Sequence, residues 1–355
     1  MISIAELAKA LGSDAAGDDK LMVSGAAEPG TAQRHEVALA MSPEFADELK
    51  NGAAEAAILW PNADWQAMGL KAAIFAPRPR YVLSGVTEVF DHPLHVEDGI
   101  SSMAVIDPSA EIGEGASIGP FVVIRGNVKI GRGCRILPHV MISENVQIGD
   151  DALLHAGVKI GARVRIGDRF IAQPGAVLGG DGFSFVTPTP GVVDEARSTG
   201  AITSQDQESY VRINSLGAVV VGDDVEVGAN ACIDRGTIRD TSIGNGTKID
   251  NLVQIGHNVQ VGHTCLICGH SGIGGSTRIG DRVVIGGAAS IADHLHIGNN
   301  SVITGNSGVA SNVGENRIMM GYPAVRMDQN VSMYKALRRL PRILDKFMTD
   351  QKQVP

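Results

Sequence analysis

The sequence predicts a mainly β protein built around a long parallel β-helix, and the spacing of its aliphatic residues carries this prediction. From Ile106, every sixth residue is aliphatic through thirteen consecutive hexads. The spacing returns at Val221 and then runs without a miss from Ile243 through Val309. Glycine often follows the aliphatic residue, and the fifth residue of the hexad is small or β-branched, as at Val122. A strict period of six fits neither an amphipathic helix nor a simple hairpin.

Three hexads of such a chain make one triangular coil. The aliphatic first residue points toward the axis, and the small fifth residue fills a corner. We expect glycine where the chain turns, because a side chain there would cost strain. Residues three hexads apart then stack at ~4.8 Å, and roughly 28 hexads give about nine coils. A β-sandwich with chance spacing is the alternative, and it gives no reason for the period.

The composition and the flanks define the domain organisation. We predict an α/β head over 1–100, a β-helix over 101–318 with a loop insertion near 183–214, and a helical basic extension over 319–355. The N-terminal "MISIAELAKALG" reads as a helix, with Ser3 and Glu6 at capping-box spacing, and not as a signal peptide. No run approaches the length of a membrane-spanning apolar segment, and the four cysteines are widely scattered. These features predict a cytoplasmic protein without a transmembrane segment or a disulfide framework.

The segment 251–270, "NLVQIGHNVQVGHTCLICGH", resembles a metal-ligand cluster when it is read without the period. In the hexad register, His257 and His263 both take the third position of consecutive hexads, so they lie at different corners. Cys265 takes a fifth position, inside the coil, and Cys268 lies on the next face. Six extended residues span up to ~20 Å. These side chains therefore cannot meet at one ion within a chain, and we predict no metal site.

His257 has a different set of neighbours. Gly275 follows it by three hexads and stacks on it, and His294 lies one coil above Gly275. A histidine has a pKa near neutrality and can take a proton. A backbone N–H at a glycine is open to a substrate oxygen and can stabilise an oxyanion. This edge is suited to acyl transfer, and a solvated turn histidine is the structural alternative.

Several motifs then resemble one family. The block from "IDRG" to "IDNLVQIGHN", the loop "GGDGFSF" at 179–185 and "GYPA" at 321–324 closely resemble UDP-3-O-(3-hydroxyacyl)glucosamine N-acyltransferase of lipid A biosynthesis. The order of head, hexapeptide β-helix and C-terminal helix is also similar. The resemblance implies a left-handed β-helix and a homotrimer with sites between subunits. It also implies an acyl donor carried on the phosphopantetheine of acyl carrier protein, with no other cofactor.

The resemblance assigns roles to individual residues of this sequence. The catalytic histidine of the family falls on His257, and its second active-site histidine falls on His294. The oxyanion N–H falls on Gly275. Asp250, in "IDN", matches an acidic residue near the base, and with Asn251 it is expected to bind the acceptor UDP-acylglucosamine.

The head shows a partial match to the family. Ser42 and Pro43 in "VALAMSPEFADEL" are suited to begin a helix. The family forms a uridine pocket here with two aromatic walls and an asparagine. Phe45 matches one wall, but Leu39 stands where the other aromatic residue is expected, and Ser42 stands for the asparagine. A base could still stack on Phe45.

The C-terminal segment is basic although the chain carries a net charge of −9. Residues 317–355 contain eight Lys or Arg and three Asp. A solvated helix face is one interpretation, and a docking site for the acidic carrier protein is the other. The acidic body argues against nucleic acid. The basic residues lie along a helix-like run interrupted at Pro341: Lys335, Arg338, Arg339, Arg342 and Lys346.

The prediction is therefore an acyltransferase that moves a 3-hydroxyacyl chain to the 2-amine of UDP-3-O-(3-hydroxyacyl)glucosamine. Three alternatives stay open: an acetyl-CoA-dependent sugar N-acetyltransferase, a zinc-binding hexapeptide-repeat carbonic anhydrase, and a non-catalytic scaffold. Asn306, Ser307 and Gly308 stand where relatives often have methionines. We expect the acyl groove to differ from a strict fourteen-carbon ruler. The polar segment from Thr187 to Val211 either walls the site or is disordered.

Overall fold

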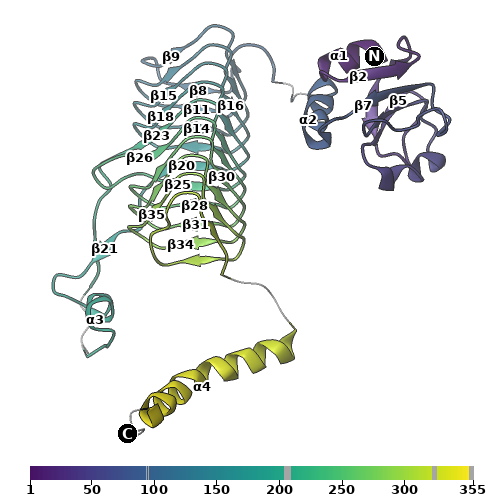
Figure 1. Cartoon of the computed structure of the whole chain (residues 1–355). Coiled ribbons are helices and arrows are strands. Elements are labelled where there is room, and N and C mark those ends of the chain that lie inside the picture. The colour runs from purple at the N-terminus through teal and green to yellow at the C-terminus, as the bar shows by residue number, and fades with distance from the viewer. Residues whose placement is uncertain (93, 95, 204–208, 322–325, 352–355) are drawn as a thin grey trace. The chain divides into compact units, whose positions relative to one another are not determined.

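The computed structural model describes residues 1–92, 94, 96–203, 209–321 and 326–351, and Figure 1 shows the chain. Two compact units divide it, Met1–His95 and Val96–Pro355. The second unit contains the β-helix, the loop insertion and the C-terminal helix. Among the described residues, no helix has the length and apolar character that crossing a membrane would require.

The head is an α/β unit around a five-stranded sheet, in which β2 is antiparallel and the other strands are parallel. Its helix α1 begins with the predicted capping box. The Ser3 side chain accepts from the Glu6 N–H, and the Glu6 carboxylate accepts from the Ser3 N–H. In sheet order the strands are β2 (Asp14–Gly17), β7 (Ala72–Phe75), β6 (Ala56–Leu59), β5 (Glu36–Ala40) and β4 (Gly25–Ala27). The remaining elements are β1 (Ile2–Ser3), α1 (Ile4–Ala10), β3 (Met22–Val23) and α2 (Pro79–Val89).

The prediction of a helix that begins after Ser42 is wrong. The chain forms only a 3₁₀ turn, η1 (Pro43–Phe45), followed by a second one, η2 (Glu48–Asn51). Pro43 does take the first helical position, but the Ser42 hydroxyl does not cap. It donates instead to Glu44 Oε1 at 2.9 Å. Because the Ser42 hydroxyl bonds Glu44, the first turn lacks the side-chain cap that favours a longer helix.

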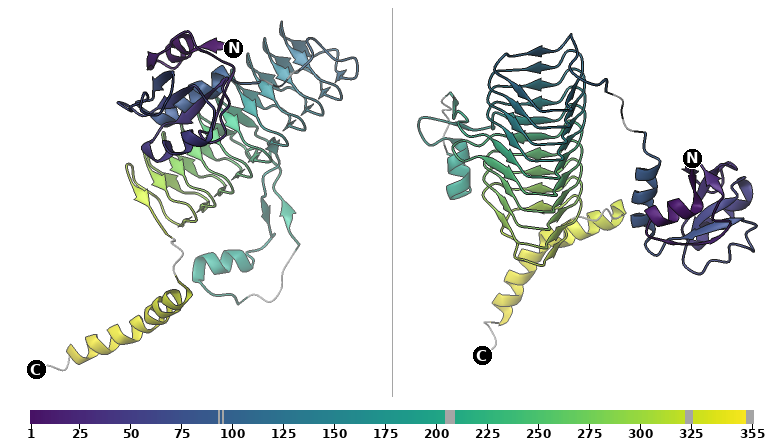
Figure 2. Two further views of the ribbon diagram at one scale, coloured as in Figure 1. Left: turned by 90° about the vertical axis from the view of Figure 1, so that its right-hand side faces the viewer. Right: turned by 90° about the horizontal axis from the view of Figure 1, so that it is seen from above.

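The second unit is a left-handed parallel β-helix. Figures 1 and 2 show its coils stacked along one axis. Within the described residues, three parallel sheets of 10, 10 and 9 strands form its faces, close to the nine coils expected. The register follows the predicted spacing of three hexads, as in the pairing of Ile118 with Ile136.

Each face is a ladder of two-residue strands with a few longer ones. The first face contains β10 (Ser117–Ile118), β13 (Arg135–Ile136), β16 (Leu153–Leu154), β19 (Ile171–Ala172), β24 (Glu226–Val227), β27 (Lys248–Ile249), β30 (Leu266–Ile267), β33 (Val284–Ile285), β36 (Val302–Ile303) and β38 (Ile318–Met319). The second contains β8 (Val105–Ile106), β11 (Val123–Ile124), β14 (Met141–Ile142), β17 (Lys159–Ile160), β20 (Val177–Gly180), β25 (Cys232–Asp234), β28 (Gln254–Ile255), β31 (Gly272–Ile273), β34 (Ser290–Ile291) and β37 (Gly308–Val309). The third contains β9 (Glu111–Ile112), β12 (Lys129–Ile130), β15 (Gln147–Ile148), β18 (Arg165–Ile166), β23 (Val219–Val221), β26 (Thr241–Ile243), β29 (Gln260–Val261), β32 (Arg278–Ile279) and β35 (His296–Ile297).

The core confirms the hexad pattern but corrects the reason for its glycines. First- and fifth-position side chains are buried through most of the β-helix. Apart from Gly179 (φ of 85°), the glycines after the aliphatic residues do not adopt a left-handed conformation. A Cβ at Gly113 would lie 2.5 Å from the carbonyl carbon of Gly131 in the next coil, so close approach excludes a side chain. Positive φ falls two residues later, at Gly115 (72°) and Asn127 (56°), where glycine and asparagine tolerate it.

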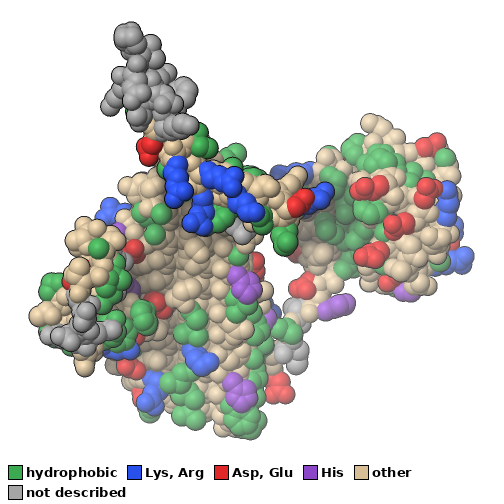
Figure 3. Space-filling model, turned by 90° about the horizontal axis from the view of Figure 1, so that it is seen from below, with side chains coloured by type: hydrophobic (Ala, Val, Ile, Leu, Met, Phe, Trp, Pro, Cys, Tyr) green, Lys and Arg blue, Asp and Glu red, His purple; other side chains and the backbone are tan. Residues whose placement is uncertain are grey.

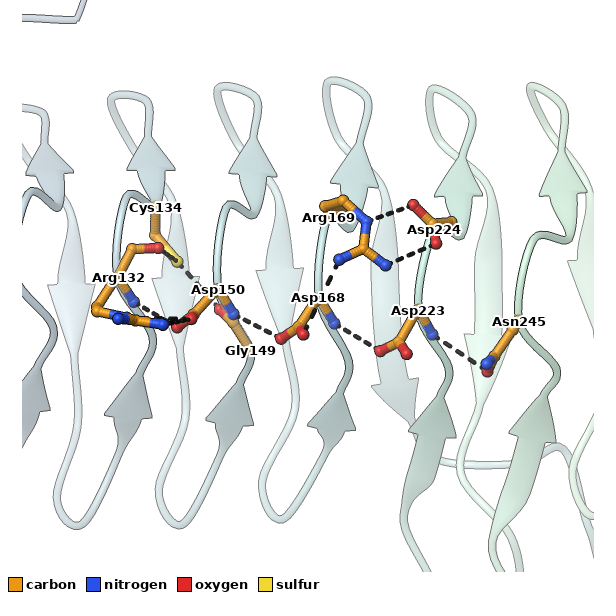
Figure 4. A network of polar contacts seen from close by, with 9 residues as sticks. All are labelled: Arg132, Cys134, Gly149, Asp150, Asp168, Arg169, Asp223, Asp224 and Asn245. Carbon is orange, nitrogen blue, oxygen red and sulfur yellow. Dashed lines mark hydrogen bonds and ion pairs between the residues drawn. The ribbon is translucent and has the colours of Figure 1, made fainter.

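A ladder of polar side chains runs along one corner and ties successive coils together (Figure 4). Six members accept through a side-chain Oδ1 from the backbone N–H one coil before them, over 2.7 to 3.2 Å. Between Asn245 and Asp281 the member is His263, whose Nδ1 is the acceptor. These bonds satisfy N–H groups at the turns, which a corner would otherwise leave without a partner. The Oδ1 acceptors are Asp150, Asp168, Asp223, Asn245, Asp281 and Asn299.

Two departures from the regular coil shape the site region. The slip at "RDTS" makes one coil longer than the others, so that Cys232 pairs with Gln254. The loop insertion leaves the second face after β20. Its described part contains the antiparallel pair β21 (Phe185–Val186) and β22 (Val211–Arg212), with the helix α3 (Val192–Thr199), which the sequence pattern did not predict.

The C-terminal segment forms one helix, α4 (Met327–Gln351), which continues through Pro341 instead of stopping there. Proline removes one helical hydrogen bond, and the remaining turns continue on both sides. Residues 322–324 of "GYPA" lie outside the described residues, as does the side chain of Lys346.

Candidate active site

His257 lies directly after β28, at a corner of the β-helix, and its ring is held on one side. Its Nδ1 atom is 2.8 Å from Asn258 Oδ1 and 3.4 Å from Thr237 Oγ1. Its backbone carbonyl accepts from the Ser276 N–H at 2.8 Å. The side chain is half-buried. The second ring nitrogen, Nε2, therefore faces away from these anchors.

Gly275 stacks on His257, as the sequence predicts. A Cβ at Gly275 would lie 2.8 Å from His257 Nε2, so the ring rests against this glycine. Within the described part of the chain, the Gly275 N–H has no hydrogen-bond acceptor. The site thus brings a histidine nitrogen and an unpaired backbone donor close together, which is what addition to a carbonyl requires.

His294 lies one coil further along the same edge. It follows β34, its side chain is exposed, and its N–H donates to the Gly275 carbonyl at 2.9 Å. The structure therefore brings His257, Gly275 and His294 together on one edge in the predicted order.

The loop insertion forms one wall of this site. A Cβ at Gly182 would lie 2.6 Å from the Cβ of His257, so the backbone of "GGDGFSF" covers the histidine. The Gly182 N–H donates to Ser215 Oγ at 3.1 Å, which joins the two ends of the insertion. These contacts come from residues that flank the segment from Thr187 to Val211, so the role expected for that segment stays a prediction.

The acidic residue beside His257 is Asp234, and the expectation that Asp250 lies near the base is wrong within one chain. Burial raises the pKa of Asp234, while a hydrogen bond from Gln254 Nε2 (3.0 Å) and the charge of His257 act in the opposite direction. Asp250 follows β27 at the preceding corner, where the N–H groups of Asn251 and Gly269 donate to its carboxylate. The long coil aligns Asp234, in "IDRG", with the histidine corner, which spacing alone did not reveal.

Asp250 and Asn251 belong to a separate groove on the first face. This groove has a volume of about 620 Å³. Asn251 Oδ1 also accepts from the Ala229 N–H, which fixes its amide. The lining combines charged, amide and apolar groups, including Gln173, Glu226, Lys248, Leu266 and Cys268. Such a lining is suited to a polar acceptor with an apolar chain.

The histidines and cysteines of 251–270 are spread over different faces, as the period predicts. Cys265 is buried, and its thiol donates to the Gly280 carbonyl at 3.1 Å. His263 lies after β29, and its Nδ1 accepts from the Asn245 N–H at 3.0 Å. Among the described residues, no group of three His, Cys, Asp or Glu side chains is arranged to hold a metal ion.

The head and the tail present their predicted residues differently. Phe45 is 39% exposed on the 3₁₀ turn, whereas Leu39 packs against the head's core. The tail residues Lys335, Arg338, Arg339 and Arg342 are all exposed on α4, and Figure 3 shows a group of basic side chains there. The guanidinium of Arg338 lies 5.8 Å from the centre of the Tyr334 ring.

The residues expected at the end of the acyl groove lie on the last coils. Gly308 is exposed, and a Cβ there would meet nothing within 4 Å. Ser307 is buried and accepts from the Gly321 N–H at 3.1 Å. Asn306 is exposed at a turn with φ of 58°.

A left-handed β-helix that carries a histidine beside an unpaired backbone N–H is the arrangement expected of an acyltransferase of the hexapeptide-repeat class. The names of the relatives support this class. A UDP-3-O-acylglucosamine N-acyltransferase of Ruegeria pomeroyi is 58% identical over 343 residues, 96% of this chain and 94% of the relative. A protein of the same name from Paracoccus denitrificans is 50% identical, over 78% of this chain and 75% of the relative.

Other comparisons concern the β-helix. The family model described as the GMPPB C-terminal domain matches residues 100–182. The solved Arabidopsis UDP-N-acetylglucosamine acyltransferase aligns at 24% identity with a TM-score of 0.53, over 63% of this chain and 71% of that one, which supports the fold. The chain belongs to the UDP-3-O-acylglucosamine N-acyltransferase family. This confirms the resemblance on which the predicted role in lipid A biosynthesis rests.

Proposed function

We propose that the protein transfers a 3-hydroxyacyl chain from the phosphopantetheine of acyl carrier protein to the 2-amine of UDP-3-O-(3-hydroxyacyl)glucosamine, in the cytoplasm. The observation that carries the proposal is that His257 Nε2 lies 2.8 Å from where a Cβ of residue 275 would be, beside a glycine whose N–H has no acceptor in the described chain. No further cofactor is needed, because the thioester already activates the acyl group.

In the proposed reaction the sugar amine attacks the thioester carbonyl while His257 Nε2 takes a proton from the nitrogen. The carbonyl oxygen gains negative charge and accepts from the Gly275 N–H. Collapse of the intermediate breaks the C–S bond, and the thiolate of the carrier leaves with the proton held by His257. The exposed His294, one coil above Gly275 and two coils above His257, would orient the donor arm.

The corner positions support a homotrimer. The groove with Asp250 and Asn251 lies at the corner that precedes His257 in the coil, so one chain presents its acceptor groove and its base at different edges. A threefold assembly of prisms brings one corner of each copy against another corner of its neighbour. The acceptor would then lie in the groove of one copy and meet His257 of the next.

Charge and exposure support the remaining parts of the proposal. The exposed Lys335, Arg338, Arg339 and Arg342 form a basic surface that is suited to the acidic carrier protein. Phe45 is exposed enough for a uracil ring to stack on it. Leu39 packs inward, so we expect one aromatic contact to the base instead of two.

The proposal is tested with a ladder of 3-hydroxyacyl carrier proteins, acetyl-CoA and the UDP acceptor. We expect transfer from the carrier proteins, no transfer from acetyl-CoA, and a trimeric mass by sedimentation. His257→Ala should reduce kcat by ~10²–10⁴-fold, the usual contribution of a general base. Transfer from acetyl-CoA alone, stoichiometric zinc, or no transfer to the UDP-sugar at any chain length would each reject the proposal in favour of an alternative.

A further inference from the structure

The residue after the histidine, Asn258, is held in a single amide orientation. Its Nδ2 donates to the Arg239 carbonyl at 2.9 Å, and its Oδ1 accepts from the Thr237 N–H at 3.1 Å. If the oxygen and the nitrogen of this amide were exchanged, its N–H would face the Thr237 N–H and its oxygen would face the Arg239 carbonyl. Amide orientation is decided by such a network. The atom that faces His257 Nδ1 at 2.8 Å is therefore an oxygen.

A carboxamide oxygen only accepts hydrogen bonds, so His257 Nδ1 must carry the proton. In the neutral ring, Nε2 then holds the lone pair, and this is the nitrogen that lies against Gly275. We propose that Asn258 is a positioning residue that fixes His257 in the Nδ1–H tautomer, so that Nε2 is available as the base. The inference rests on the proposed role of His257.

His263 provides an internal comparison, because it takes the same hexad position one face further on. There the Asn245 N–H donates to the ring, so Nδ1 is the acceptor and the proton of the neutral ring is on Nε2. The residue after His263 is Thr264, which has no amide to face the ring. Two histidines in equivalent repeat positions therefore have opposite tautomers, and of these two only His257 presents an unprotonated Nε2.

The backbone around Asn258 is suited to this role and allows a conservative variant. Asn258 has φ of 61°, and its own N–H donates to the buried Thr241 hydroxyl at 2.9 Å. Asp151 and Asp224 take the same hexad position with φ of 58° and 56°. An aspartate at 258 can therefore adopt this conformation and keep an oxygen toward His257 and toward the Thr237 N–H, although its second oxygen loses the hydrogen bond to the Arg239 carbonyl.

The decisive measurement is the ¹⁵N spectrum of histidine-labelled protein, assigned with His257→Gln and His263→Gln. We expect the wild-type His257 signal to show Nδ1–H and the His263 signal to show Nε2–H. In Asn258→Ala we expect His257 to become a mixture of tautomers. A wild-type His257 with Nε2–H would overturn the proposal, whether or not any variant folds.

Kinetics give a second, independent readout. Asn258→Ala should lower kcat by roughly 10- to 100-fold, less than the ~10²–10⁴ of a lost base, with KM within about threefold. Asn258→Asp should restore part of the kcat lost in Asn258→Ala and move the limb of the pH profile, because it keeps an oxygen toward Nδ1 but loses the bond to the Arg239 carbonyl. Asn299→Ala is the matched control, because Asn299 also accepts from a backbone N–H and donates to an oxygen, far from His257 along the chain. It should leave kcat unchanged.

An Asn258→Ala enzyme with kcat within threefold of wild type, or an equal loss in Asn299→Ala, would overturn the positioning role. The proposed function fails in a different way, through a His257→Ala enzyme that stays active. In that case the wild-type tautomer would still be read from the spectrum.

Discussion

The tight contact between His257 and Gly275 gives the sharpest prediction, which concerns Gly275→Ala. The substitution adds one methyl group 2.8 Å from His257 Nε2 and 2.9 Å from Cε1. The backbone N–H proposed as oxyanion donor is retained. The change therefore isolates the fit between the imidazole and the glycine from the donor itself.

The magnitude follows from the distances. Ordinary van der Waals contact begins at 3.4 Å, so the methyl and the ring must separate by about 0.6 Å. Asn258 holds the other side of the ring at 2.8 Å, which limits how the ring can move. A misplacement of ~1 Å can cost ~10²-fold in rate. We expect kcat to fall by about 10- to 100-fold, which corresponds to ~1.4–2.7 kcal/mol in activation free energy.

The assay is steady-state transfer from a 3-hydroxyacyl carrier protein, with thermal unfolding as a check on the fold. Gly272→Ala is the matched control on the preceding strand, because a Cβ at Gly272 meets nothing within 4 Å. Neither glycine has a positive φ, so both alanines fit the backbone. A Gly275→Ala enzyme with full kcat would refute the idea that the substrate amine must reach Nε2 in this space. An equal loss in Gly272→Ala would attribute the effect to the strand.

Three further predictions follow from the site and the tail. Burial raises the pKa of Asp234, so ionisation of this carboxyl group destabilises the folded state as the pH rises above the ordinary pKa of aspartate. The Tm of Asp234→Asn minus the Tm of wild type should therefore grow more positive from pH 4 to pH 7. A difference that stays constant over this range would contradict the prediction. The double variant Arg338→Glu and Arg339→Glu should raise KM for the acyl carrier protein about tenfold at low salt and less at high salt, and an effect independent of salt would exclude electrostatic docking. Gly308→Met fills open space at the expected end of the acyl groove and should shift the preferred chain to a shorter length in an acyl ladder, whereas an unchanged sharp optimum at fourteen carbons would exclude Gly308 as a determinant.

The β-helix could be predicted from sequence because its physics is local and repeated. Each hexad must place one aliphatic side chain inside, so the period is visible in any short window. The stacking of Gly275 on His257 follows from counting three hexads along the chain, and no energetic argument was needed. The position of Cys265 inside the coil followed in the same way.

The parts that could not be predicted depend on irregular or tertiary features. Asp234 reaches the histidine corner only because one coil is longer than the rest, and the regular count of three hexads places a different residue there. The turn after Ser42 has helix signals, but the serine bonds Glu44 instead of capping, and the spacing does not show this. The covering of His257 by Gly182 comes from an insertion whose path the repeat does not encode.

The two neighbouring histidines show how a repeat can hold a site without repeating its chemistry. His257 and His263 share a hexad position and a place after a two-residue strand. They differ in what reaches Nδ1, which is an amide oxygen in one case and a backbone N–H in the other. The extra residues of the long coil bring Thr237 and Arg239 to Asn258 and so orient its amide. The longer coil that hid Asp234 from the hexad count is thus also the feature that distinguishes His257, the proposed base, from His263.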